Sequence, residues 1–471
     1  MGKKRKDGRI FTPEPIVKHM LYNEMWRHHE LDQHIIDNSC GDGAFLREIV
    51  DHYCDVYNCD KENGKGMGLK TILETYIHGI EIDPAEHKKC LENLDAVAKK
   101  YGISDVKWDI QNRDALSCHD YDGKMDYVIA NPPYIRTHDL ECDLSDYSFA
   151  SDGMKDIYLA FYELGFRMLN DNGTMCYITP SSWFTSLAGQ KMRDYVMETR
   201  YLQIVHDFGH AQVFENATTY VSICVFRKAK DPDWLHPYVW YVKGENGITV
   251  PYDDMCIDGK FYFGTPEQLR RMREIIEYGK DTGRQDKVFQ VKNGYATNAD
   301  DVFVVGDTPW PTGGSVIPAV KSSTGKISAC IYPYDRKGKT LSEETLREAS
   351  PMEYKWLAAH RERLESRKTG EPWYAFGRTQ AIGDTYKDKW AVRSIIRGPE
   401  DMRPVKAIAG VGVYGGLYIL TEHPEELKSL ETQDFMNYVR MLGKYKSGGY
   451  YTFSSKELEN YLNWKYGKET D

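Results

Sequence analysis

The first 230 or so residues alternate between short β-rich runs and longer helical patterns, and this alternation is the strongest constraint on the fold. Strands alternating with helices indicate βαβ units and a largely parallel sheet. Helical patterns are expected over Ala44–Val50 and from Pro84 to Lys99. The expected strands are His34–Asp37, Tyr76–Ile82, Met125–Ala130, Thr174–Thr179, Leu202–Phe208 and Tyr220–Phe226. We therefore predict an α/β fold with a doubly wound sheet.

The strand–helix rhythm is lost after Lys228, where aspartate, proline and tryptophan become frequent. We predict one domain over residues 1–245 and a second over 246–471, with a linker over about 246–286. The second half mixes short strands, glycine turns and two helical stretches, Ser342–Ser366 and Thr432–Lys444. These features predict a mixed α+β domain.

Composition excludes several classes of protein. Hydrophobic residues make up 41% of the 471-residue chain and charged residues 28%, which is typical of a globular protein. No apolar run of about 18 residues occurs, so we expect no membrane partner. The ten cysteines form no C-x-x-C pair and have no clustered histidine partners, so neither disulfides nor a metal is expected. The basic N-terminus lacks a following apolar stretch, so a cytoplasmic location is expected.

Charge is unevenly distributed. The chain carries a net −10, yet residues 321–410 hold 18 lysines and arginines against 12 acidic residues. A basic face on an acidic protein is compatible with a polyanion bound in one place, and equally with a solvated surface. The candidate DNA-binding residues are Arg361, Arg363, Arg367, Arg378, Arg393, Arg397, Lys444 and Tyr450.

The sharpest motif is Asn131-Pro132-Pro133-Tyr134, directly after the apolar run Asp126–Ala130. Two prolines fix φ and remove two N–H donors, so the strand must end in a rigid turn. The side-chain carbonyl of Asn131 and the backbone carbonyl of Pro132 then converge as acceptors for an exocyclic amino group. Tyr134 offers a flat face on which a base can stack, worth about 1–3 kcal/mol. The alternative is an ordinary Asn-Pro turn.

Acidic and glycine residues surround this motif in the expected sheet. The turn Asp37–Gly43 lies between a strand and a helix, and its glycines allow a ligand close to the backbone. Glu81 ends the next strand and is placed to accept from both hydroxyls of a ribose, while Asp114 is placed to accept from an adenine amino group. An acidic pocket suits a cationic sulfonium nucleoside and argues against a nucleotide phosphate.

These motifs resemble, in order, those of the TaqI-like N6-adenine DNA methyltransferases of the gamma arrangement, which use S-adenosylmethionine. Phe11–Met20 resembles the motif that closes over the methionine moiety of the cofactor. Asn131–Tyr134 resembles the catalytic motif in its adenine form. Lys155–Tyr158 and Tyr177–Trp183 resemble the next two motifs. The resemblance covers about the first 230 residues and implies a Rossmann-like methyltransferase sheet followed by a target-recognition domain.

The resemblance also implies roles for individual residues. Phe214 is expected on the opposite face of a flipped adenine from Tyr134. Asn38 stands where the family usually has proline, and we expect a side-chain hydrogen bond from Asn38 to stabilise a similar bend. The implied cofactor-binding residues are Phe11, Thr12, Pro13, Asp37, Ser39, Cys40, Gly41, Gly43, Glu81, Ile82, Asp114, Ala115 and Asn131.

The function implied is site-specific transfer of a methyl group from S-adenosylmethionine to N6 of an adenine flipped out of double-stranded DNA. A cognate restriction endonuclease would be a separate protein. Two alternatives stay open: an enzyme of the same fold that methylates an RNA base or a glutamine amide, and a non-catalytic DNA-binding specificity protein. The second half of the chain, which follows the catalytic motifs, favours DNA.

Overall fold

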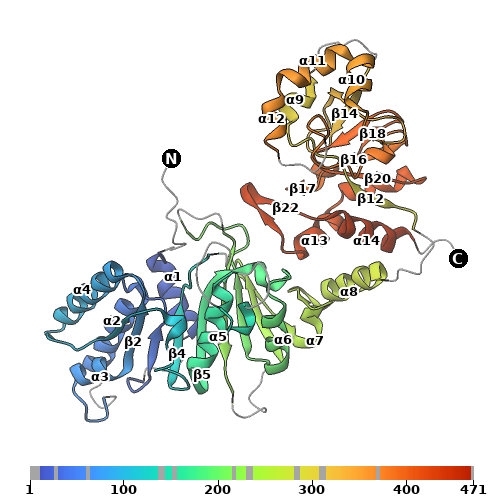
Figure 1. The fold of residues 1–471 in the computed structure, drawn as a ribbon. Coiled ribbons are helices and arrows are strands. Elements are labelled where there is room, and N and C mark those ends of the chain that lie inside the picture. The colour runs from blue at the N-terminus through green and yellow to red at the C-terminus, as the bar shows by residue number, and fades with distance from the viewer. Residues whose placement is uncertain are drawn as a thin grey trace. The chain divides into compact units, whose positions relative to one another are not determined.

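The computed structural model describes residues 11–25, 30–59, 64–135, 144–150, 156–214, 219–229, 237–280, 287–306, 314–367 and 372–467. Contacts within the chain divide it into two compact units, residues 1–270 and 271–471 (Figure 1). Lys155 of the expected motif Lys155–Tyr158 lies outside the described residues.

The first unit is built on one nine-stranded sheet with the order β3-β2-β1-β4-β5-β7-β6-β8-β9. Strands β3, β2, β1, β4 and β5 are parallel, and β7 runs antiparallel between β5 and β6. The strands are β1 (Ile35–Asp37), β2 (Ile77–Glu81), β3 (Asp109–Asn112), β4 (Met125–Ala130), β5 (Leu169–Pro180), β6 (Leu202–Asp207), β7 (Val221–Arg227), β8 (Tyr238–Lys243) and β9 (Asn246–Pro251). The doubly wound sheet predicted from the sequence is therefore confirmed.

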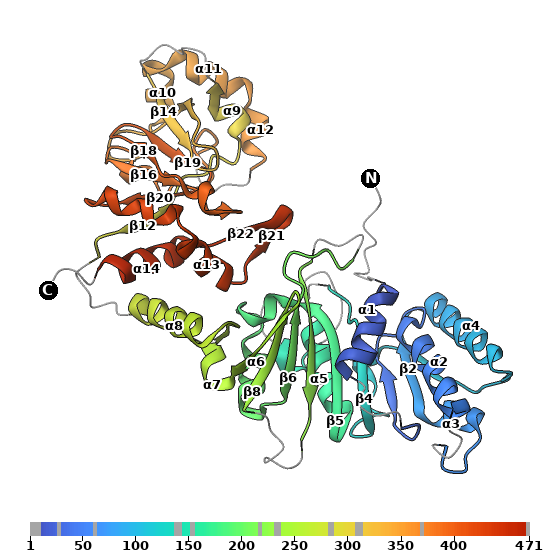
Figure 2. The same cartoon turned by 180° about the vertical axis from the view of Figure 1, so that it is seen from behind.

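Helices connect these strands (Figures 1 and 2). The α-helices are α1 (Glu14–Lys18), α2 (Ala44–Cys59), α3 (Leu69–Tyr76), α4 (Pro84–Lys100), α5 (Tyr158–Met168), α6 (Gln190–Thr199) and α7 (Tyr252–Met255). A π-helical segment η1 (His19–Met25) continues α1, and short 3-10 turns are η3 (Ala115–Ser117), η5 (Ser148–Ala150) and η6 (Ser181–Phe184). A small hairpin joins β10 (Cys256–Ile257) and β11 (Lys260–Phe261).

The two faces of the sheet have separate apolar layers, as the alternation along β7 shows. Val221, Ile223 and Val225 belong to a buried cluster with side chains of α1, η1, α2 and α4. Phe226, on the other face, packs against Tyr162 and Phe166 of α5, with ring centroids 5.5 and 5.1 Å away. Successive residues of a strand point to opposite faces, so helices cover both sides. This is the arrangement expected of a doubly wound fold.

The sheet continues past the boundary expected at residue 245. Strand β8 pairs in parallel with β6, and β9 pairs with β8 as a hairpin, so residue 245 lies in the turn between them. Along β8, Val239 and Tyr241 are buried while Tyr238 and Trp240 are exposed, the alternation of a half-buried strand. The division instead falls at Arg271, within α8 (Pro266–Lys280).

The described residues of the second unit form three small sheets with orders β12-β20-β16-β18, β13-β15-β14-β19 and β17-β22-β21. Its strands are β12 (Gln290–Asn293), β13 (Val304–Gly306), β14 (Val316–Lys321), β15 (Ile327–Ile331), β16 (Lys389–Val392), β17 (Ile395–Ile396), β18 (Val405–Ala407), β19 (Gly412–Tyr414), β20 (Leu417–Leu420), β21 (Tyr445–Lys446) and β22 (Tyr450–Thr452). Strand pairing is antiparallel except between β14 and β19. Largely antiparallel sheets with separate helices confirm the expected α+β class.

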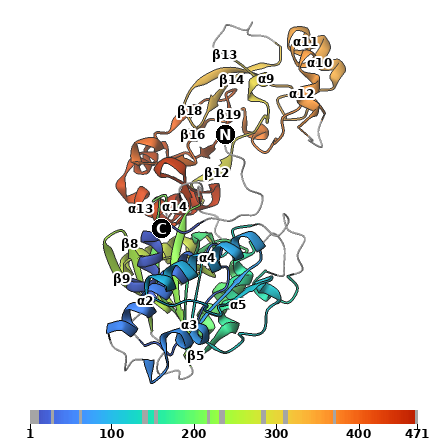
Figure 3. The same cartoon turned by 90° about the vertical axis from the view of Figure 1, so that its left-hand side faces the viewer.

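Helices α10 to α12 lie together beside β14 (Figures 1 and 3). The expected single helical stretch Ser342–Ser366 is interrupted twice, because Pro351 starts a new helix and a further break falls at His360. The helices of the unit are α9 (Asp300–Phe303), α10 (Glu343–Ala349), α11 (Pro351–Ala359), α12 (Arg361–Glu365), α13 (Gln433–Met441) and α14 (Ser455–Tyr466). Its 3-10 segments are η8 (Ile382–Asp384), η9 (Pro399–Met402), η10 (Pro424–Glu431) and η11 (Ser447–Gly449).

Tyr295, Tyr332 and Phe376 lie in this unit's core. The rings of Tyr295 and Phe376 stack with centroids 4.6 Å apart, and the ring of Tyr332 meets that of Phe376 at 67°. Among the described residues of the whole chain, no helix has the length and apolar character needed to cross a membrane.

Candidate active site

The candidate site forms at the point where the strand order reverses. Strand β1 lies between β2 and β4, and both neighbours run parallel to it. The carboxyl ends of the three strands therefore meet at one edge, where open α/β sheets bind ligands. The glycine turn follows β1, Glu81 ends β2, and Asn131 follows β4. The sequence motifs thus come together although they are far apart in the chain.

The two glycines of the turn have different roles. Both have positive φ, +55° at Gly41 and +85° at Gly43. A Cβ at Gly43 would lie 2.8 Å from Sγ of Cys90 on α4, so this glycine permits close packing of turn and helix. A Cβ at Gly41 would meet no atom within 4 Å. Gly41 therefore leaves room for a ligand beside the backbone, as a binding turn requires.

Glu81 is buried and holds the turn. Its Oε2 accepts from the amide of Gly41 at 2.9 Å, and its Oε1 accepts from the amide of Asp83 at 2.8 Å. A carboxylate has about four acceptor sites, so these bonds leave capacity for ribose hydroxyls. Next to it, the Ile82 side chain is 65% exposed, which is unusual for an isoleucine at the end of a central strand. The ribose role of Glu81 stays a prediction.

Asp37 lies at the end of β1 with only 1% of its surface exposed. Burial raises the pKa of its carboxyl to about 8, with further raising from the charges of Glu81 and Asp42 and opposition from the amide of Ser39. That amide donates to Asp37 Oδ1 at 3.1 Å. A buried acid with this pKa is ready to ionise beside a cationic ligand.

Three further candidate cofactor-binding residues stabilise the local backbone. Asp114 follows β3 and caps η3 by accepting from the amide of Leu116 at 3.0 Å. Ala115 is buried in that turn. Cys40 is buried as well, and its amide donates to the carbonyl of Ile80 at 3.0 Å. These contacts fix the edge of the site, and contact with a cofactor stays a prediction for all three.

Asn131 joins three motifs. Its side-chain Nδ2 donates to Oγ1 of Thr12 at 3.1 Å, and its backbone carbonyl accepts from Oγ of Ser39 at 3.4 Å. Thr12 stands between the half-exposed Phe11 and Pro13, which caps α1 with extended backbone. Pro132 is buried and Pro133 half-buried. The segment Phe11–Pro13 therefore lies beside the motif Asn131–Tyr134, and its contact with a cofactor stays a prediction.

Tyr134 and Phe214 adjoin one another without forming a parallel pair. Their ring centroids are 6.3 Å apart with an angle of 62° between the planes. The Tyr134 hydroxyl donates to the carbonyl of Ile178 at 3.0 Å, and Phe214 is only 2% exposed. A base stacked between two aromatic faces needs them nearly parallel. Phe214 would therefore have to turn to hold a base, and its stacking role stays a prediction.

A family model described as "Eco57I restriction-modification methylase" matches residues 57–214, which include Glu81, Asp114, Asn131 and Tyr134. This segment is similar to the Eco57I restriction-modification methylase family. It lies within the first unit, which is called the methylase unit below.

Curated relatives carry related names. The chain is 21% identical to the Type II restriction enzyme and methyltransferase RM.Eco57I of Escherichia coli over 82% of its length and 49% of the relative's. It is 26% identical to the Type II methyltransferase M.BstVI of Geobacillus stearothermophilus over 41% of its length and 36% of the relative's. The chain thus spans half or less of the length of these relatives.

A solved structure of the Type IIL restriction-modification enzyme MmeI in complex with DNA is similar in fold. It aligns with 90% of this chain and 61% of its own at a TM-score of 0.60 and 14% sequence identity. The likeness extends beyond the methylase unit, since the unit holds residues 1–270 only. It supports a fold that MmeI shares with both units of this chain.

Sequence reasoning missed a contact behind the glycine turn of the methylase unit. Asn38 does not stabilise the bend locally: its Nδ2 donates to the hydroxyl of Tyr177 on β5 at 2.6 Å, 139 residues away in the chain. Asn38 and Tyr177 are both buried. The side chain that replaces the family's proline thus links β1 to β5.

The candidate DNA-binding residues of the second unit separate into two groups. Arg361, Arg363 and Arg367 lie on or after α12. Arg367 donates to the carbonyls of Thr297 and Trp373 at 2.6 Å and of Leu364 at 2.8 Å, so its guanidinium holds the local fold. Arg361 pairs with Glu365 at 2.7 Å, and Arg363 lies 3.5 Å from Asp301.

Arg393, Arg397, Lys444 and Tyr450 lie on or next to the strands of the sheet β17-β22-β21, whereas Arg378 does not. Arg397 is exposed, with its Nε 3.6 Å from the Cβ position of Gly449. Tyr450 begins β22, and Lys444 donates to Glu457 at 2.5 Å. Arg393 pairs with Asp401, and Arg378 is exposed beside its bridge to Ala296. Arg397 and Tyr450 are therefore the candidates that the structure places together, and their contact with DNA stays a prediction.

Proposed function

We propose that this chain is a site-specific DNA methyltransferase that transfers a methyl group from S-adenosylmethionine to N6 of an adenine flipped out of double-stranded DNA. The observation that supports it best is the position of Asn131. It follows β4 at the switch point and is hydrogen-bonded to Thr12 of the N-terminal segment and to Ser39 of the glycine turn. The residue that carries the proposed catalytic amide thus contacts the N-terminal segment through its side chain and the proposed cofactor turn through its backbone.

The residues at this edge fit the cofactor. The open space beside Gly41 admits a ligand against the backbone, and the exposed Ile82 offers an apolar surface for its adenine. Asp37, Glu81 and Asp114 supply acidic side chains around it, which favour a positively charged ligand. S-adenosylmethionine supplies an electrophilic methyl group on a sulfonium.

The catalytic contribution of the chain is mainly alignment. In the orientation fixed by the bond to Thr12, the Asn131 amide presents Oδ1 as its acceptor end, and the carbonyl of Pro132 is the second acceptor. Both accept from the target amino group and hold its nitrogen in line for attack. Such alignment contributes about 7–11 kcal/mol to a two-reactant step. The proton that the nitrogen loses after methylation passes to solvent, so no strong base is required.

Holding the base outside the duplex is the second task. Flipping costs a few kcal/mol of pairing and stacking. The ring of Tyr134, fixed through its hydroxyl by Ile178, provides one stacking face, and Phe214 provides the other after its ring turns. The form Asn-Pro-Pro-Tyr, rather than a serine form, supports adenine as the target.

DNA as the substrate is supported by the relatives and by the second unit. The relatives are named as Type II methyltransferases, and the MmeI structure contains DNA. We assign target recognition to the second unit, with Arg397 and Tyr450 as the first residues to test. The glycine-motif, catalytic and recognition parts in this order support the gamma arrangement. A cognate restriction endonuclease on a separate chain is the further partner that this function implies.

The test is expression in a host that lacks adenine methylation, followed by reading of modified bases across its genome. We expect one short sequence motif methylated at N6 of adenine. Methyl groups on RNA, on protein or on cytosine would contradict the proposal and identify the alternative substrate. Stoichiometric binding of S-adenosylmethionine without methylation of any of them would favour a non-catalytic DNA-binding protein.

A further inference from the structure

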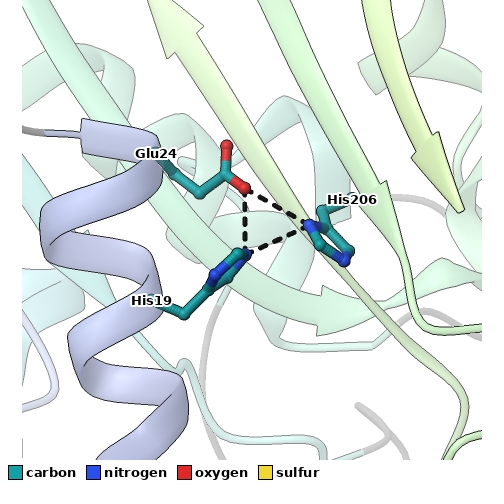
Figure 4. A group of neighbouring side chains, drawn as sticks. All are labelled: His19, Glu24 and His206. Atoms are coloured by element: carbon teal, nitrogen blue, oxygen red, sulfur yellow. Dashed lines mark hydrogen bonds and ion pairs between the residues drawn. The ribbon is translucent and has the colours of Figure 1, made fainter. Parts of the chain in front are cut away.

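His19, Glu24 and His206 form a compact group outside the candidate active site. Figure 4 shows the three side chains pointing toward one another, two from the N-terminal helical segment and one from β6. Nε2 of His19 lies 3.0 Å from Oε1 of Glu24 and 3.1 Å from Nδ1 of His206, which is 3.3 Å from the same Oε1. The side chains are 24%, 8% and 15% exposed, so the group is largely shielded from water.

Hydrogen bonds alone cannot account for all three contacts in this group. Each apex nitrogen carries at most one hydrogen, and a ring nitrogen that carries one cannot accept another. A carboxylate oxygen accepts hydrogen bonds and does not donate them. At most two of the three contacts are therefore hydrogen bonds at once. A cation at the centre attracts all three atoms together.

A second histidine group in the same unit shows the contrast. His34 Nδ1 lies 2.9 Å from His78 Nε2, and His78 Nδ1 lies 2.7 Å from Asp109 Oδ2. Here each contact uses a different nitrogen of His78, so one proton per contact satisfies both hydrogen bonds. Among the described residues, His19, Glu24 and His206 are the group whose ligand atoms converge.

The geometry points to a metal site, and we propose that His19, Glu24 and His206 bind one divalent transition-metal ion of the zinc class. Bonds of about 2.0–2.2 Å to nitrogen and oxygen place neighbouring ligands of such an ion about 3.0–3.5 Å apart, as the three atoms are here. Two imidazoles with one carboxylate favour zinc, cobalt or nickel over magnesium and calcium, which prefer oxygen ligands.

The backbone supports this arrangement. His19 and Glu24 are five residues apart in η1, and π-helical winding, with its i to i+5 hydrogen bonds, brings such positions to one face. Nδ2 of the Asn23 side chain lies 3.1 Å from Nδ1 of His19, and a flip of this amide would exchange its nitrogen and oxygen. With its oxygen turned to that nitrogen, Asn23 accepts the Nδ1–H that a metal-bound His19 carries and orients the ring. Sequence spacing missed the site because His206 is 187 residues from His19.

The ion would fasten the N-terminal segment to β6. His19 directly follows α1, and Thr12, which contacts Asn131, precedes α1 in the same segment. The expected role is structural, and methyl transfer needs no step at the ion.

The test is titration of metal-free protein with Co²⁺, followed by visible absorption and by thermal unfolding, with Mg²⁺ as the probe of nonspecific binding. We expect one Co²⁺ per chain without a thiolate charge-transfer band, displacement by Zn²⁺, and a higher Tm in Zn²⁺ but not in Mg²⁺. The absent thiolate band separates this site from the cysteines, of which Cys59 is exposed.

Variants assign the ligands. His206→Ala and Glu24→Gln should weaken Co²⁺ binding about a hundredfold or more. The control variant His34→Gln, in the group of His34, His78 and Asp109, should bind Co²⁺ like the wild type. Glu24→Gln keeps the size and shape of the side chain, so it tests the site even if His206→Ala fails to fold. Unchanged affinity in Glu24→Gln, or a thiolate band in the wild type, would overturn the proposal.

Discussion

The side-chain amide of Asn131 donates to the hydroxyl of Thr12 across 119 residues of sequence. This bond connects the N-terminal segment to the proposed catalytic motif, so we expect the segment to orient the amide as well as to cover the cofactor, as proposed. Thr12 is thus a positioning residue for Asn131.

Replacing Thr12 by valine removes the acceptor but keeps the shape of the side chain. One hydrogen bond contributes about 0.5–1.5 kcal/mol, so the rate of methyl transfer should fall about two- to tenfold. Single-turnover transfer of labelled methyl to DNA measures this rate. Thr12→Ser, which keeps the hydroxyl, should retain most of it; a serine variant as slow as the valine variant would show that the hydroxyl does not orient Asn131.

The raised pKa of Asp37 predicts a pH-dependent stability. The unfolded chain releases this proton near the ordinary value of 3.8, and the folded chain near 8. Between these values the folded state binds more protons, so the free energy of unfolding should decrease as pH rises, by up to about 1.4 kcal/mol per pH unit. The decrease should end above pH 8.

Denaturant unfolding of the wild type and of Asp37→Asn from pH 5 to pH 8 checks this, because the difference between the two cancels other titrations. Saturating S-adenosylmethionine should reduce the slope, since a nearby cation favours the carboxylate. Parallel curves for the two proteins would show that Asp37 ionises at its ordinary pKa.

The buried pair of Asn38 and Tyr177 predicts coupled effects on stability. Tyr177→Phe leaves the Asn38 amide without its 2.6 Å partner, and a buried unsatisfied donor costs about 1–3 kcal/mol. The double variant with Asn38→Ala should lose less than the sum of the single losses. Denaturant unfolding of the four proteins measures the coupling; strictly additive losses would mean that the two side chains do not interact.

Asp434 on α13 binds side chains of α8 and α14. It accepts from Arg271 on α8 at 2.7 Å, and from Tyr461 and Lys465 on α14 at 2.8 and 3.0 Å. The hydrogen bond from Arg271 lowers the pKa of the Asp434 carboxyl well below its ordinary value. Its stabilisation should therefore be full above pH 4 and be lost as pH falls further.

Asp434→Asn should lower the free energy of unfolding by about 1–3 kcal/mol at neutral pH, a figure reduced because the site is partly exposed. Glu267→Gln, at an exposed position of the same α8, should change it by less than about 0.5 kcal/mol. Equal effects of the two substitutions in denaturant unfolding would exclude a specific role for Asp434.

The sequence predicted the centre of the sheet well, because strands such as Met125–Ala130 are short apolar runs that end at proline or glycine. Strand β3 was missed, since Asp109–Asn112 is largely polar and lies at the sheet edge. The hairpin of β8 and β9 was also missed, although the alternation in Tyr238–Lys243 carries a usable signal. The position of β7 between β5 and β6 depends on long-range pairing that no local pattern encodes.

The candidate site was predictable as motifs but not as contacts. Spacing identified Asn131, Glu81 and Asp37 as chemically important. It did not show that Glu81 holds the Gly41 amide, that Asn38 reaches Tyr177, or that the rings of Tyr134 and Phe214 are inclined. The sequence also made Arg367 a candidate DNA contact, whereas in the structure its guanidinium donates to three backbone carbonyls. Each of these depends on residues far apart in the chain.

The most direct test of the proposed chemistry compares wild type with Asn131→Ala for binding of S-adenosylmethionine and for transfer of labelled methyl to double-stranded DNA that contains the target sequence. In the proposed mechanism the amide holds the target nitrogen and is not the main contact of the cofactor. The variant should therefore bind the cofactor within a few-fold of the wild type and transfer no measurable methyl to adenine. Wild-type-like transfer by Asn131→Ala would contradict the account.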